Sequence, residues 1–474
     1  MIFSISWKNI WRSKTRSLVV ILAISFGLWG GVFGVGLMSG MINQRISAAI
    51  NNEVSHIQIH HKKFMENDEP KYTIDNVNDI IAEINKIPGV VASSKRFKIQ
   101  GMANKSGRQS GVYIIGVEPE NEKKVTQIYS KLKDTTGTYL DNENPKDVFM
   151  GEKLARSLSI ITYSLDSSSL ENLKTLKINE ETLQLIDTMS FQVFRTEAKM
   201  KNAMIDCIGE EDFEKYESKI RNTLAVYKSR KKVVFKMQGH DSHNIGVARK
   251  VCGVYKTSNT TFDQMNVFMD YDKLAEETGF SKDQAHEIAI LAENTEVVDE
   301  IADKLRTMYP DLDIQTWKQL QPDLAMMTEY LVLYYYILIG FILFALAFGI
   351  INTMLMAVLE RTKELGMLMA VGMNKMKIFS MIILETILLS LTGGVVGMIL
   401  GWVFIEIFSK VGIDIGSTGE GMEAMGYDAI IYPDITFDFY IGVTLLVVFT
   451  GIISAIYPAR KALKLKPVEA LRTV

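Results

Sequence analysis

The sequence predicts a membrane protein with four transmembrane α-helices and a large extracytoplasmic α/β (α+β) domain inserted between the first and the second helix. Four apolar stretches are each long enough to cross the hydrocarbon core, which takes roughly 20 helical residues. The segment between the first two stretches, residues 39–329, has the pattern of a folded domain. The composition of 47% hydrophobic and 23% charged residues agrees, because it is too apolar for a soluble enzyme and too polar for a protein wholly within lipid.

Residues 1–16 are expected to form a cytoplasmic amphipathic helix on the membrane surface. Aromatic and aliphatic side chains recur there at helical spacing, with basic residues between them: Phe3, Trp7, Ile10 and Trp11. The first span, 17–38, follows. We interpret it as a retained anchor, because its apolar run exceeds that of a signal peptide and no small-residue cleavage site follows it.

Residues 39–329 are expected to form the extracytoplasmic domain. A strand pattern at 54–60 is followed by a helix at about 75–86 and by two strands that meet at a Lys-Ser-Gly turn. A strand-helix-strand pattern returns near the end of the segment, so we expect one compact domain built from both ends of it. Residues 161–230 are charged and helical in pattern, and we interpret them as a helical insertion.

The remaining spans follow this domain. The expected ranges are 330–359 for the second span, 360–377 for a cytoplasmic helical stub, 378–408 for the third span, 409–436 for a short extracytoplasmic loop, 437–457 for the fourth span and 458–474 for a cytoplasmic tail. Lys and Arg cluster before the first span, between the second and third, and after the fourth, whereas residues 411–436 contain none. The positive-inside rule therefore places both termini in the cytoplasm.

Glycines predict where helices pack closely. The third span carries Gly393, Gly397 and Gly401 at four-residue spacing, and the first span carries Gly27 and Gly31, with Gly30 and Gly34 beside them. Small residues at this spacing let two helix backbones approach each other. The pattern indicates a packed helix pair without naming the partner helix.

The stub between the second and third spans is charged at its start and apolar afterwards. Glu360, Arg361, Lys363 and Glu364 come first, and then Leu365, Leu368 and Met369 share one helical face. Gly366 and Gly372 are expected to break or bend the helix. The apolar face with its methionine suits docking into a groove on another protein, and the alternative is a loop with a few snorkelling charges.

Catalytic signatures are absent from the sequence. It contains no G-x-x-x-x-G-K-[ST], no G-x-S-x-G and no H-E-x-x-H, and the net charge of −3 gives no reason to expect nucleic acid. His240, Asp241 and His243 allow a metal site, but a polar turn is the preferred interpretation. His56 and His60 fall on the polar side of a strand, which favours a solvated face. Cys207 and Cys252 give no disulfide framework, although one bridge is conceivable.

Two stretches together resemble the FtsX-like or MacB-type ABC transporter permeases. Residues 352–385 are similar to the family signature at nine positions: Asn352, Glu360, Arg361, Glu364, Leu365, Gly366, Leu368, Ala370 and Gly372. Residues 457–472 are similar to the family ending at Pro458, Ala459, Ala462, Pro467, Glu469, Ala470, Leu471 and Arg472. The start of the chain, "VSHIQIHH", "GEKLARSL" and residues 251–269 resemble the lipoprotein-releasing (LolC/LolE-like) branch, and 161–230 departs from the family pattern.

The resemblance implies a permease subunit of a mechanotransmission-type ABC transporter in the bacterial inner (cytoplasmic) membrane, with the large domain, MacB-like, in the periplasm. Residues 360–377 are then the coupling helix, docked on a cytoplasmic ABC ATPase dimer, and ATP and Mg would be bound by that partner and not by this chain. Further implied partners are a second permease copy or paralogue, the lipid bilayer, a periplasmic carrier and a lipoprotein substrate, with no nucleic acid. Alternatives are MacB-like efflux of peptides or small molecules and an FtsX-like signal relay that controls a cell-wall hydrolase.

No residue is assigned a catalytic, cofactor-binding or metal-binding role. The residues expected to couple to the ATPase are Glu360, Arg361, Glu364, Leu365, Gly366, Leu368, Met369 and Gly372. Those expected to pack helices are Gly27, Gly31, Gly393, Gly397 and Gly401. Among the coupling residues, the apolar ones are expected to dock and the charged ones to set the orientation of the stub.

Overall fold

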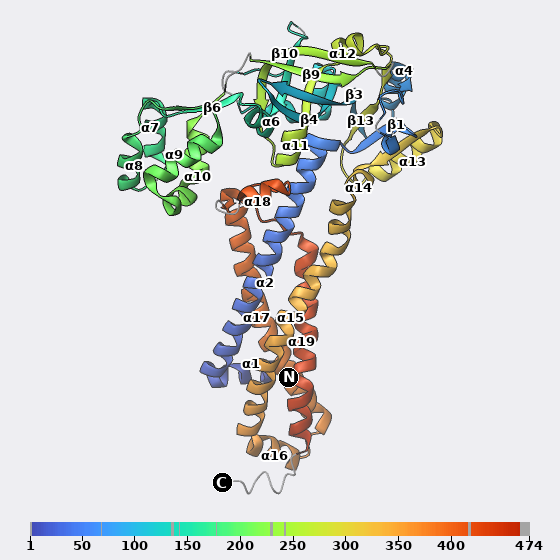
Figure 1. Ribbon diagram of the computed structural model, residues 1–474. Helices are drawn as coiled ribbons and strands as arrows, with labels where there is room; N and C mark the ends of the chain where they lie inside the picture. The colour runs from blue at the N-terminus through green and yellow to red at the C-terminus, as the bar shows by residue number, and fades with distance from the viewer. Residues whose placement is uncertain are drawn as a thin grey trace. The chain divides into compact units, whose positions relative to one another are not determined.

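The computed structural model describes residues 2–67, 69–133, 137–141, 143–176, 178–227, 231–240, 243–415 and 419–464 (Figure 1). The chain divides into two compact units. The membrane unit comprises residues 1–43, 326–414 and 430–474, and the α/β unit comprises residues 44–325 and 415–429. Each unit is described separately below.

The membrane unit is a bundle of long helices. Within the described ranges, four helices are long and apolar enough to cross a membrane: α2 (Lys14–Ala48), α15 (Pro322–Glu360), α17 (Lys375–Val411) and α19 (Phe437–Leu463). The shorter elements of this unit are α1 (Ile2–Ile10), η1 (Trp11–Ser13), α16 (Thr362–Ala370), β15 (Ile413–Asp414) and β16 (Ile430–Ile431). Each long helix extends beyond its predicted span. The spans were predicted from the apolar residues alone, and the helices continue into the polar residues that flank them.

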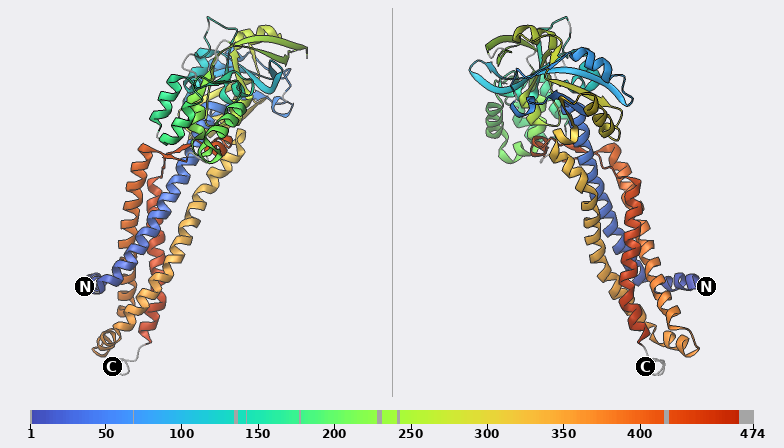
Figure 2. Two further views of the ribbon diagram at one scale, coloured as in Figure 1. Left: turned by 60° about the vertical axis from the view of Figure 1, so that its left-hand side comes forward. Right: turned by 90° about the vertical axis from the view of Figure 1, so that its right-hand side faces the viewer.

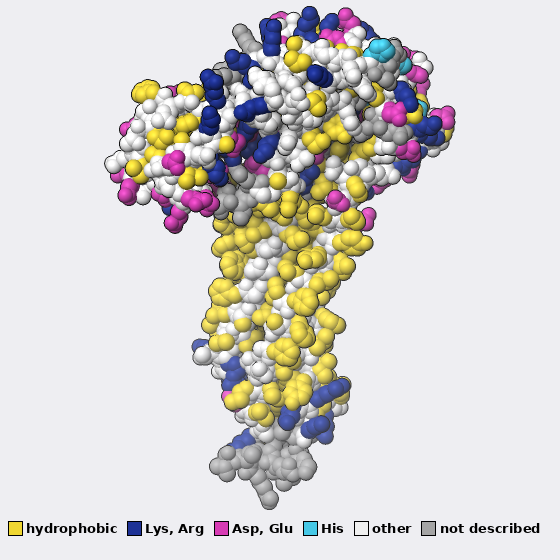
Figure 3. Space-filling view, viewed as in Figure 1, with side chains coloured by type: hydrophobic (Ala, Val, Ile, Leu, Met, Phe, Trp, Pro, Cys, Tyr) yellow, Lys and Arg dark blue, Asp and Glu magenta, His cyan; other side chains and the backbone are white. Residues whose placement is uncertain are grey.

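Apolar side chains cover the surface of this bundle as a broad band (Figure 3). Lys and Arg side chains gather at the end of the band where the stub and the N-terminal helix lie. A helix rises 1.5 Å per residue, so α15 is about 58 Å long, against about 30 Å for the hydrocarbon core. The helix is therefore long enough to cross the bilayer with a large remainder.

The predicted packing glycines lie where helices approach each other most closely. A Cβ atom at Gly397 would lie 2.6 Å from the backbone oxygen of Ser25, and one at Gly401 would lie 2.8 Å from a Val32 methyl group, so α17 packs directly on α2. Gly393 of α17 faces Ile24 and Ile21, which also lie on α2. Gly27 and Gly31 face α15 instead, at Leu346, Ile342 and Ile339. The partner helices, which the sequence left open, are thus α2 for the glycines of α17 and α15 for those of α2.

The α/β unit is built on one large mixed sheet. In the part of the chain that is described, nine strands pair in the order β14-β1-β13-β3-β4-β11-β5-β10-β9, and β9 pairs in addition with β3. The strands are β1 (Ile57–His61), β3 (Val90–Lys105), β4 (Arg108–Val117), β5 (Asp147–Gly151), β9 (Lys232–Gln238), β10 (Asn244–Tyr255), β11 (Asn266–Asp270), β13 (Glu287–Ala292) and β14 (Leu312–Thr316). A minor sheet pairs β2 (Ile74–Asp75) with β12 (Gln284–Ala285).

The long strand β3 joins two parts of this sheet. Its first half pairs with β13 and its second half with both β4 and β9, so six strands from β3 through β4, β11, β5, β10 and β9 close into a ring. The predicted turn between β3 and β4 is a two-residue connection, Ser106 at φ 52° and Gly107 at φ 81°, which is the positive-φ pair of a type I′ turn. Early strands β1 and β3 interleave with late strands β13 and β14, as the repeated pattern at the two ends predicted.

The α/β unit also contains short helices outside the insertion. They are α3 (Phe64–Asn67), α4 (Val77–Ile84), α5 (Pro119–Val125), η3 (Ile128–Lys131), α6 (Glu152–Ser157), α11 (Thr260–Met265), α12 (Tyr271–Thr278), α13 (Val298–Met308), α14 (Trp317–Leu320) and α18 (Gly419–Ala424). A π-helical segment, Ala49–Val54, follows α2. Apolar side chains inside the ring of strands, such as Phe97, Ile114 and Phe235, are completely buried.

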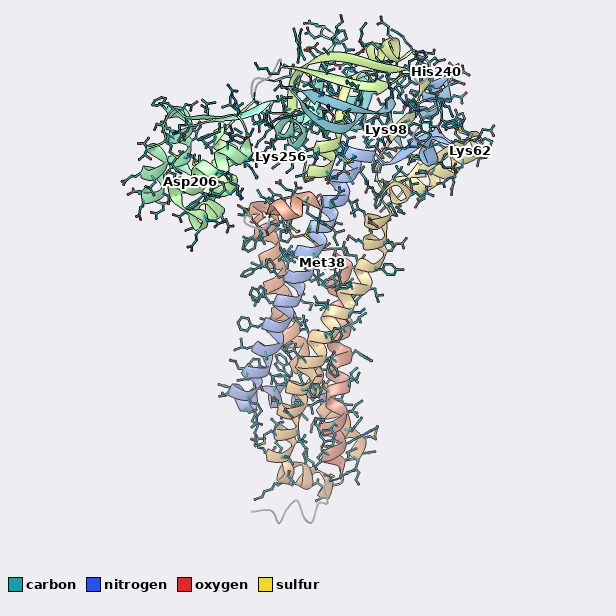
Figure 4. The ribbon with its side chains drawn as sticks, viewed as in Figure 1. Met38, Lys62, Lys98, Asp206, His240 and Lys256 are labelled. Atoms are coloured by element: carbon teal, nitrogen blue, oxygen red, sulfur yellow. The ribbon has the colours of Figure 1, made fainter. Side chains whose placement is uncertain are left out.

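The insertion contains short strands as well as the predicted helices. Its helices are α7 (Ser167–Thr175), α8 (Glu180–Asp187), α9 (Glu197–Ile208) and α10 (Glu210–Leu224), and a small sheet joins β7 (Val193–Phe194), β6 (Ile161–Ser164) and β8 (Ala225–Tyr227). Figure 4 labels Asp206 on this lobe and Lys98 on the main sheet. Strands β6 and β8 pair at the two ends of the insertion, which returns the chain to the sheet after the helices.

The solvated strand face expected for His56 and His60 is wrong. His60 is fully buried and His56 is 7% exposed. The His60 ring stacks on Phe64 at 5.7 Å between ring centroids, and its Nε2 lies 3.0 Å from Gln58 Oε1. Other elements cover this polar sheet face, so alternation alone did not reveal its burial. Burial also lowers the pKa of both imidazoles.

Both cysteines are free thiols in the structure. Cys207 Sγ lies 3.2 Å from the backbone oxygen of Leu185, and Cys252 Sγ lies 3.2 Å from that of Val148. Each thiol therefore has a local backbone acceptor, and the two residues do not form the disulfide that the sequence left conceivable.

Candidate functional site

The stub that follows α15 is a separate short helix with defined ends. Helix α15 ends at Glu360, Arg361 leaves helical geometry, and α16 runs from Thr362 to Ala370. Gly372, at φ 93°, closes α16 with a Schellman motif: its N–H donates to Met369 O, and the next N–H, of Met373, donates to Leu368 O. The predicted break at Gly372 is therefore present, whereas Gly366 lies buried inside α16 without breaking it.

One face of α16 packs against its own bundle. Leu365 is 4% exposed and belongs to the buried apolar cluster of the membrane unit, together with Val358 and Ile382. Met369 packs partly against the same cluster, and Leu368 is half-buried. The expectation that Leu365 docks on a partner is therefore corrected, because its side chain is already buried in this chain. For Leu368 and Met369, which are partly exposed, docking stays a prediction.

Two apolar side chains of this segment are strongly exposed, although Met367 also borders the cavity between α16 and its bundle that is described below. Met367 is 57% exposed and Val371 is 84% exposed. They are four residues apart and so lie on one helical face, with exposed Lys363 one turn before Met367. Sequence reasoning did not single out Met367 and Val371 as exposed, because both faces of the stub are apolar and only the packing distinguishes them.

Arg361 anchors the start of the stub inside the bundle. Its Nη1 donates to Glu385 Oε1 of α17 at 2.9 Å, and its Nη2 donates to the backbone oxygen of Asn9 in α1 at 2.8 Å. The Arg361 and Glu385 side chains are 17% and 8% exposed. A buried cation with a carboxylate and a carbonyl as partners fixes the geometry of this junction, since losing one partner leaves an uncompensated charge.

Two more ion pairs connect the stub region to the N-terminal stretch. Arg12 pairs with Glu364 at 2.5 Å, and Arg16 pairs with Glu360. Both acids were expected to orient the stub toward a partner, but in the structure they bind side chains of this chain. The signal in the sequence was the matching spacing, because both the arginines and the acids are four residues apart.

The N-terminal helix α1 is itself packed on the bundle. Ile10 is 2% exposed within the same apolar cluster as Leu365, and Ser6 Oγ donates to the backbone oxygen of Met381 in α17 at 3.3 Å. Between α1, α15, α16 and α17 lies a cavity of about 280 Å³, lined mainly by apolar side chains such as Ile5, Met354 and Leu368. The stub is thus held by a buried polar junction, an apolar contact and two exposed ion pairs.

The structure shows part of the segment in which His240, Asp241 and His243 allowed a metal site. The His240 ring packs edge-on against Phe280 at 5.2 Å, and its backbone N–H donates to Thr278 O at 2.9 Å; Figure 4 labels its position. Asp241 lies outside the described residues. Within the described ranges, no group of three or more His, Cys, Asp or Glu side chains is arranged to hold a metal ion.

The family ending is described only at its start. Pro458, Ala459 and Ala462 lie on α19 and are buried. The rest of the motif lies outside the described residues: Pro467, Glu469, Ala470, Leu471 and Arg472.

Comparison with known proteins finds one family match in the C-terminal part of the chain. Residues 336–467, which include the stub, match the family described as FtsX-like permease C-terminal. The uncharacterized ABC transporter permease MJ1507 of Methanocaldococcus jannaschii is 25% identical over 229 residues, covering 47% of this chain and 54% of the relative. The macrolide export ATP-binding/permease protein MacB of Bdellovibrio bacteriovorus is 36% identical over 126 residues, covering 26% of this chain and 16% of the relative.

The match therefore spans about half of the first of these curated relatives and a sixth of the second. Among solved structures, the periplasmic region of MacB from Actinobacillus actinomycetemcomitans aligns with 57% of this chain and 92% of its own length, at 10% identity and a TM-score of 0.29. The family match lies in the C-terminal helices and the stub, whereas the 229 residues similar to MJ1507 must extend beyond them.

Proposed function

We propose that this chain, an ABC transporter permease of the FtsX-like and MacB type, transmits the motion of a cytoplasmic ATPase through α16 and α15 to its α/β unit. As a permease it is a membrane subunit without catalytic activity of its own. The observation that carries the proposal is the stub itself: a short helix, fixed at its root by Arg361 and Glu385, that presents exposed apolar side chains. A rigid attachment is what force transfer needs, since a flexible loop would absorb the motion.

The docking surface in this proposal is the face of α16 that carries Met367 and Val371. An exposed valine and methionine on one helical face have the character of anchors in a helix-in-groove contact. Glu360, Arg361 and Glu364 hold the stub in position from within the chain. ATP and Mg would be bound by the partner ATPase dimer, and a second permease copy or a paralogue would complete the transporter.

Export of peptides or small molecules is the cargo class that we place first, because a relative that is 36% identical over 126 residues is named a macrolide export protein. Release of lipoproteins, with a periplasmic carrier, is the second candidate and rests on the sequence resemblance at residues 251–269 and at the start of the chain. The FtsX-like relay to a cell-wall hydrolase is a third. One relative comes from an archaeon, so the bacterial inner membrane and a periplasmic location also belong to the proposal.

The test compares charged substitutions on exposed valines. Val371→Asp should abolish co-purification of the ATPase subunit from native membranes, because it places a carboxylate in an apolar contact. Val91→Asp is the matched control, since Val91 is 57% exposed on the α/β unit. Both variants should keep the thermal stability of the parent. Undiminished ATPase binding by the Val371 variant would refute docking through this face.

A depletion experiment separates the cargo classes. Accumulation of mislocalised lipoproteins after depletion of the chain would favour lipoprotein release, and raised sensitivity to exported compounds without that accumulation would favour MacB-like efflux. Co-purification of a cell-wall hydrolase would favour the relay.

A further inference from the structure

The N-terminal stretch that contacts the stub also carries exposed side chains of two kinds. Phe3 is 60% exposed, and Trp7 and Trp11 are each 41% exposed. Lys8 and Lys14 are exposed as well, and no acidic side chain within the described residues forms an ion pair with either of them. Figure 2 shows α1 turned sideways from the foot of α2, across the direction of the bundle. The stretch therefore presents aromatic rings and unpaired ammonium groups together.

We propose that this stretch binds the phosphate headgroups of anionic phospholipids, and that Arg12 and Arg16 exchange between those phosphates and the stub carboxylates Glu364 and Glu360. The charge of the bilayer would then set how firmly the stub is held. The proposal rests on the proposed function for the placement of this end of the bundle at the cytoplasmic leaflet.

Geometry makes this exchange possible for two of the three ion pairs that hold the stub. Arg12 and Glu364 are 60% and 45% exposed, and Arg16 and Glu360 are 26% and 46% exposed. These four groups are in contact with water and can change partner without breaking the apolar cluster. The Arg361–Glu385 pair is much less exposed, at 17% and 8%, so the root of the stub stays fixed while its side contacts change.

The strengths of the competing contacts are similar. An exposed ion pair shifts an equilibrium by about fivefold or less. Each basic side chain at an anionic leaflet strengthens membrane attachment by about fivefold. Neither contact dominates, so the fraction of arginine bound to the stub depends on the proportion of anionic lipid. With a much stronger ion pair the lipid would have no effect.

The ligand is a lipid headgroup and not free phosphate because the basic groups do not stand alone. Tryptophan side chains are typical of the membrane-water interface, because the indole N–H is polar and the rest of the ring is apolar. Trp7 and Trp11 contact each other edge to face, at 6.0 Å between ring centroids. An inorganic anion would use only the ammonium and guanidinium groups. A lipid uses both the charges and the aromatic side chains.

The test titrates the full-length chain in detergent with phosphatidylglycerol, phosphatidylcholine or inorganic phosphate and counts bound molecules by native mass spectrometry. The parent should bind phosphatidylglycerol more tightly than phosphatidylcholine, and inorganic phosphate should not displace it. Lys8→Gln with Lys14→Gln should raise the Kd for phosphatidylglycerol by about fivefold or more. Glu360→Gln with Glu364→Gln should lower it by about two- to fivefold, because both arginines are released.

The matched control is Lys62→Gln with Lys232→Gln, which removes two exposed lysines of the α/β unit and should leave the Kd unchanged. Equal binding of the two lipids, or an unchanged Kd in the Lys8 and Lys14 variant, would overturn the lipid site. An unchanged Kd in the glutamate variant would overturn the exchange. The titration needs no ATPase, so its failure leaves the proposed function standing, and loss of ATPase docking would leave the lipid site standing.

Discussion

Replacing Gly397 by alanine tests whether α17 packs on α2 as closely as the structure shows. The added Cβ would lie 2.6 Å from the backbone oxygen of Ser25 and 3.0 Å from Leu28 Cβ. The oxygen belongs to the backbone of a neighbouring helix, so no side-chain rotation relieves the clash. Gly349→Ala on α15 is the matched control, because a Cβ there meets nothing within 4 Å.

The expected magnitude is the difference between the two variants. Alanine in place of glycine stabilises a helix by about 0.5–1 kcal/mol at either position, so this contribution cancels. Overpacking at Gly397 costs about 1–3 kcal/mol. Gly349→Ala should therefore be neutral or slightly stabilising, and Gly397→Ala should be less stable than it by about 1–3 kcal/mol.

Thermal unfolding of the purified chain in detergent measures this difference. A change of 1 kcal/mol shifts the midpoint by about 2–4 °C in a domain of 150–250 residues, so Gly397→Ala should unfold about 2–12 °C below Gly349→Ala. Equal midpoints, or a higher midpoint for Gly397→Ala, would refute the close approach of α17 to α2.

Three further predictions concern other parts of the molecule. Arg96→Met should destabilise the α/β unit by about 3–5 kcal/mol, because Arg96 lies between the buried carboxylates of Glu122 (2.7 Å) and Glu287 (2.5 Å). In thermal melts the loss should grow as pH rises from 5 to 8, because burial without the cation raises the pKa of Glu287. Burial raises the pKa of Cys252 to about 12, so its alkylation by iodoacetamide at pH 8 should require unfolding, as peptide mapping would show. Gly372→Ala should destabilise the end of α16 by about 1–3 kcal/mol, because alanine is strained at the positive φ of this residue. Amide hydrogen exchange at residues 371–373 should become faster, and unchanged exchange would contradict the Schellman motif.

In the parent, Glu287 makes the stability of the α/β unit fall as pH decreases, which is opposite to its effect in the Arg96 variant. Burial alone would raise the pKa of this carboxyl, but Arg96, His60 and Lys98 together hold it below its usual value. An acid whose pKa is lower in the folded state contributes stability above its unfolded pKa and loses it as pH falls. The parent α/β unit should therefore lose stability below about pH 4.5, where the Arg96 variant should be least affected.

The membrane helices were predictable because their signal is local. A run of about 20 apolar residues predicts a span without knowledge of the rest of the chain, and the glycines of α17 indicated close packing in the same way. Their partner was not predictable, since Gly397 and Ser25 are far apart in the sequence and many helix faces carry small residues. The ring closure of β3 on β9 was missed for the same reason, because one long strand pattern does not show that its two halves have different neighbours.

The exposure of polar side chains was predicted least well where another part of the chain packs over them. His60 alternates with apolar neighbours as a solvated residue would, but Phe64 and the β13 region bury it. Arg361 and Glu364 were expected to face a partner because charges in a cytoplasmic segment usually face water. In the structure both bind groups of this chain, and only the paired four-residue spacing of Arg12, Arg16 and the two acids hinted at it.

The use of these charges within the chain has a consequence for docking. With Glu360, Arg361 and Glu364 engaged, the outward face of α16 offers Met367, Val371 and the single charge of Lys363. Association with the proposed ATPase would then depend mainly on apolar burial, which salt does not screen, whereas a contact built on the three charged residues would weaken as ionic strength shortens the Debye length. ATPase co-purification should therefore persist between 0.1 and 0.5 M salt, roughly the range over which exposed ion pairs are largely screened. Loss of the ATPase over that range would show that the acids and Arg361 leave their partners in this chain when the stub docks.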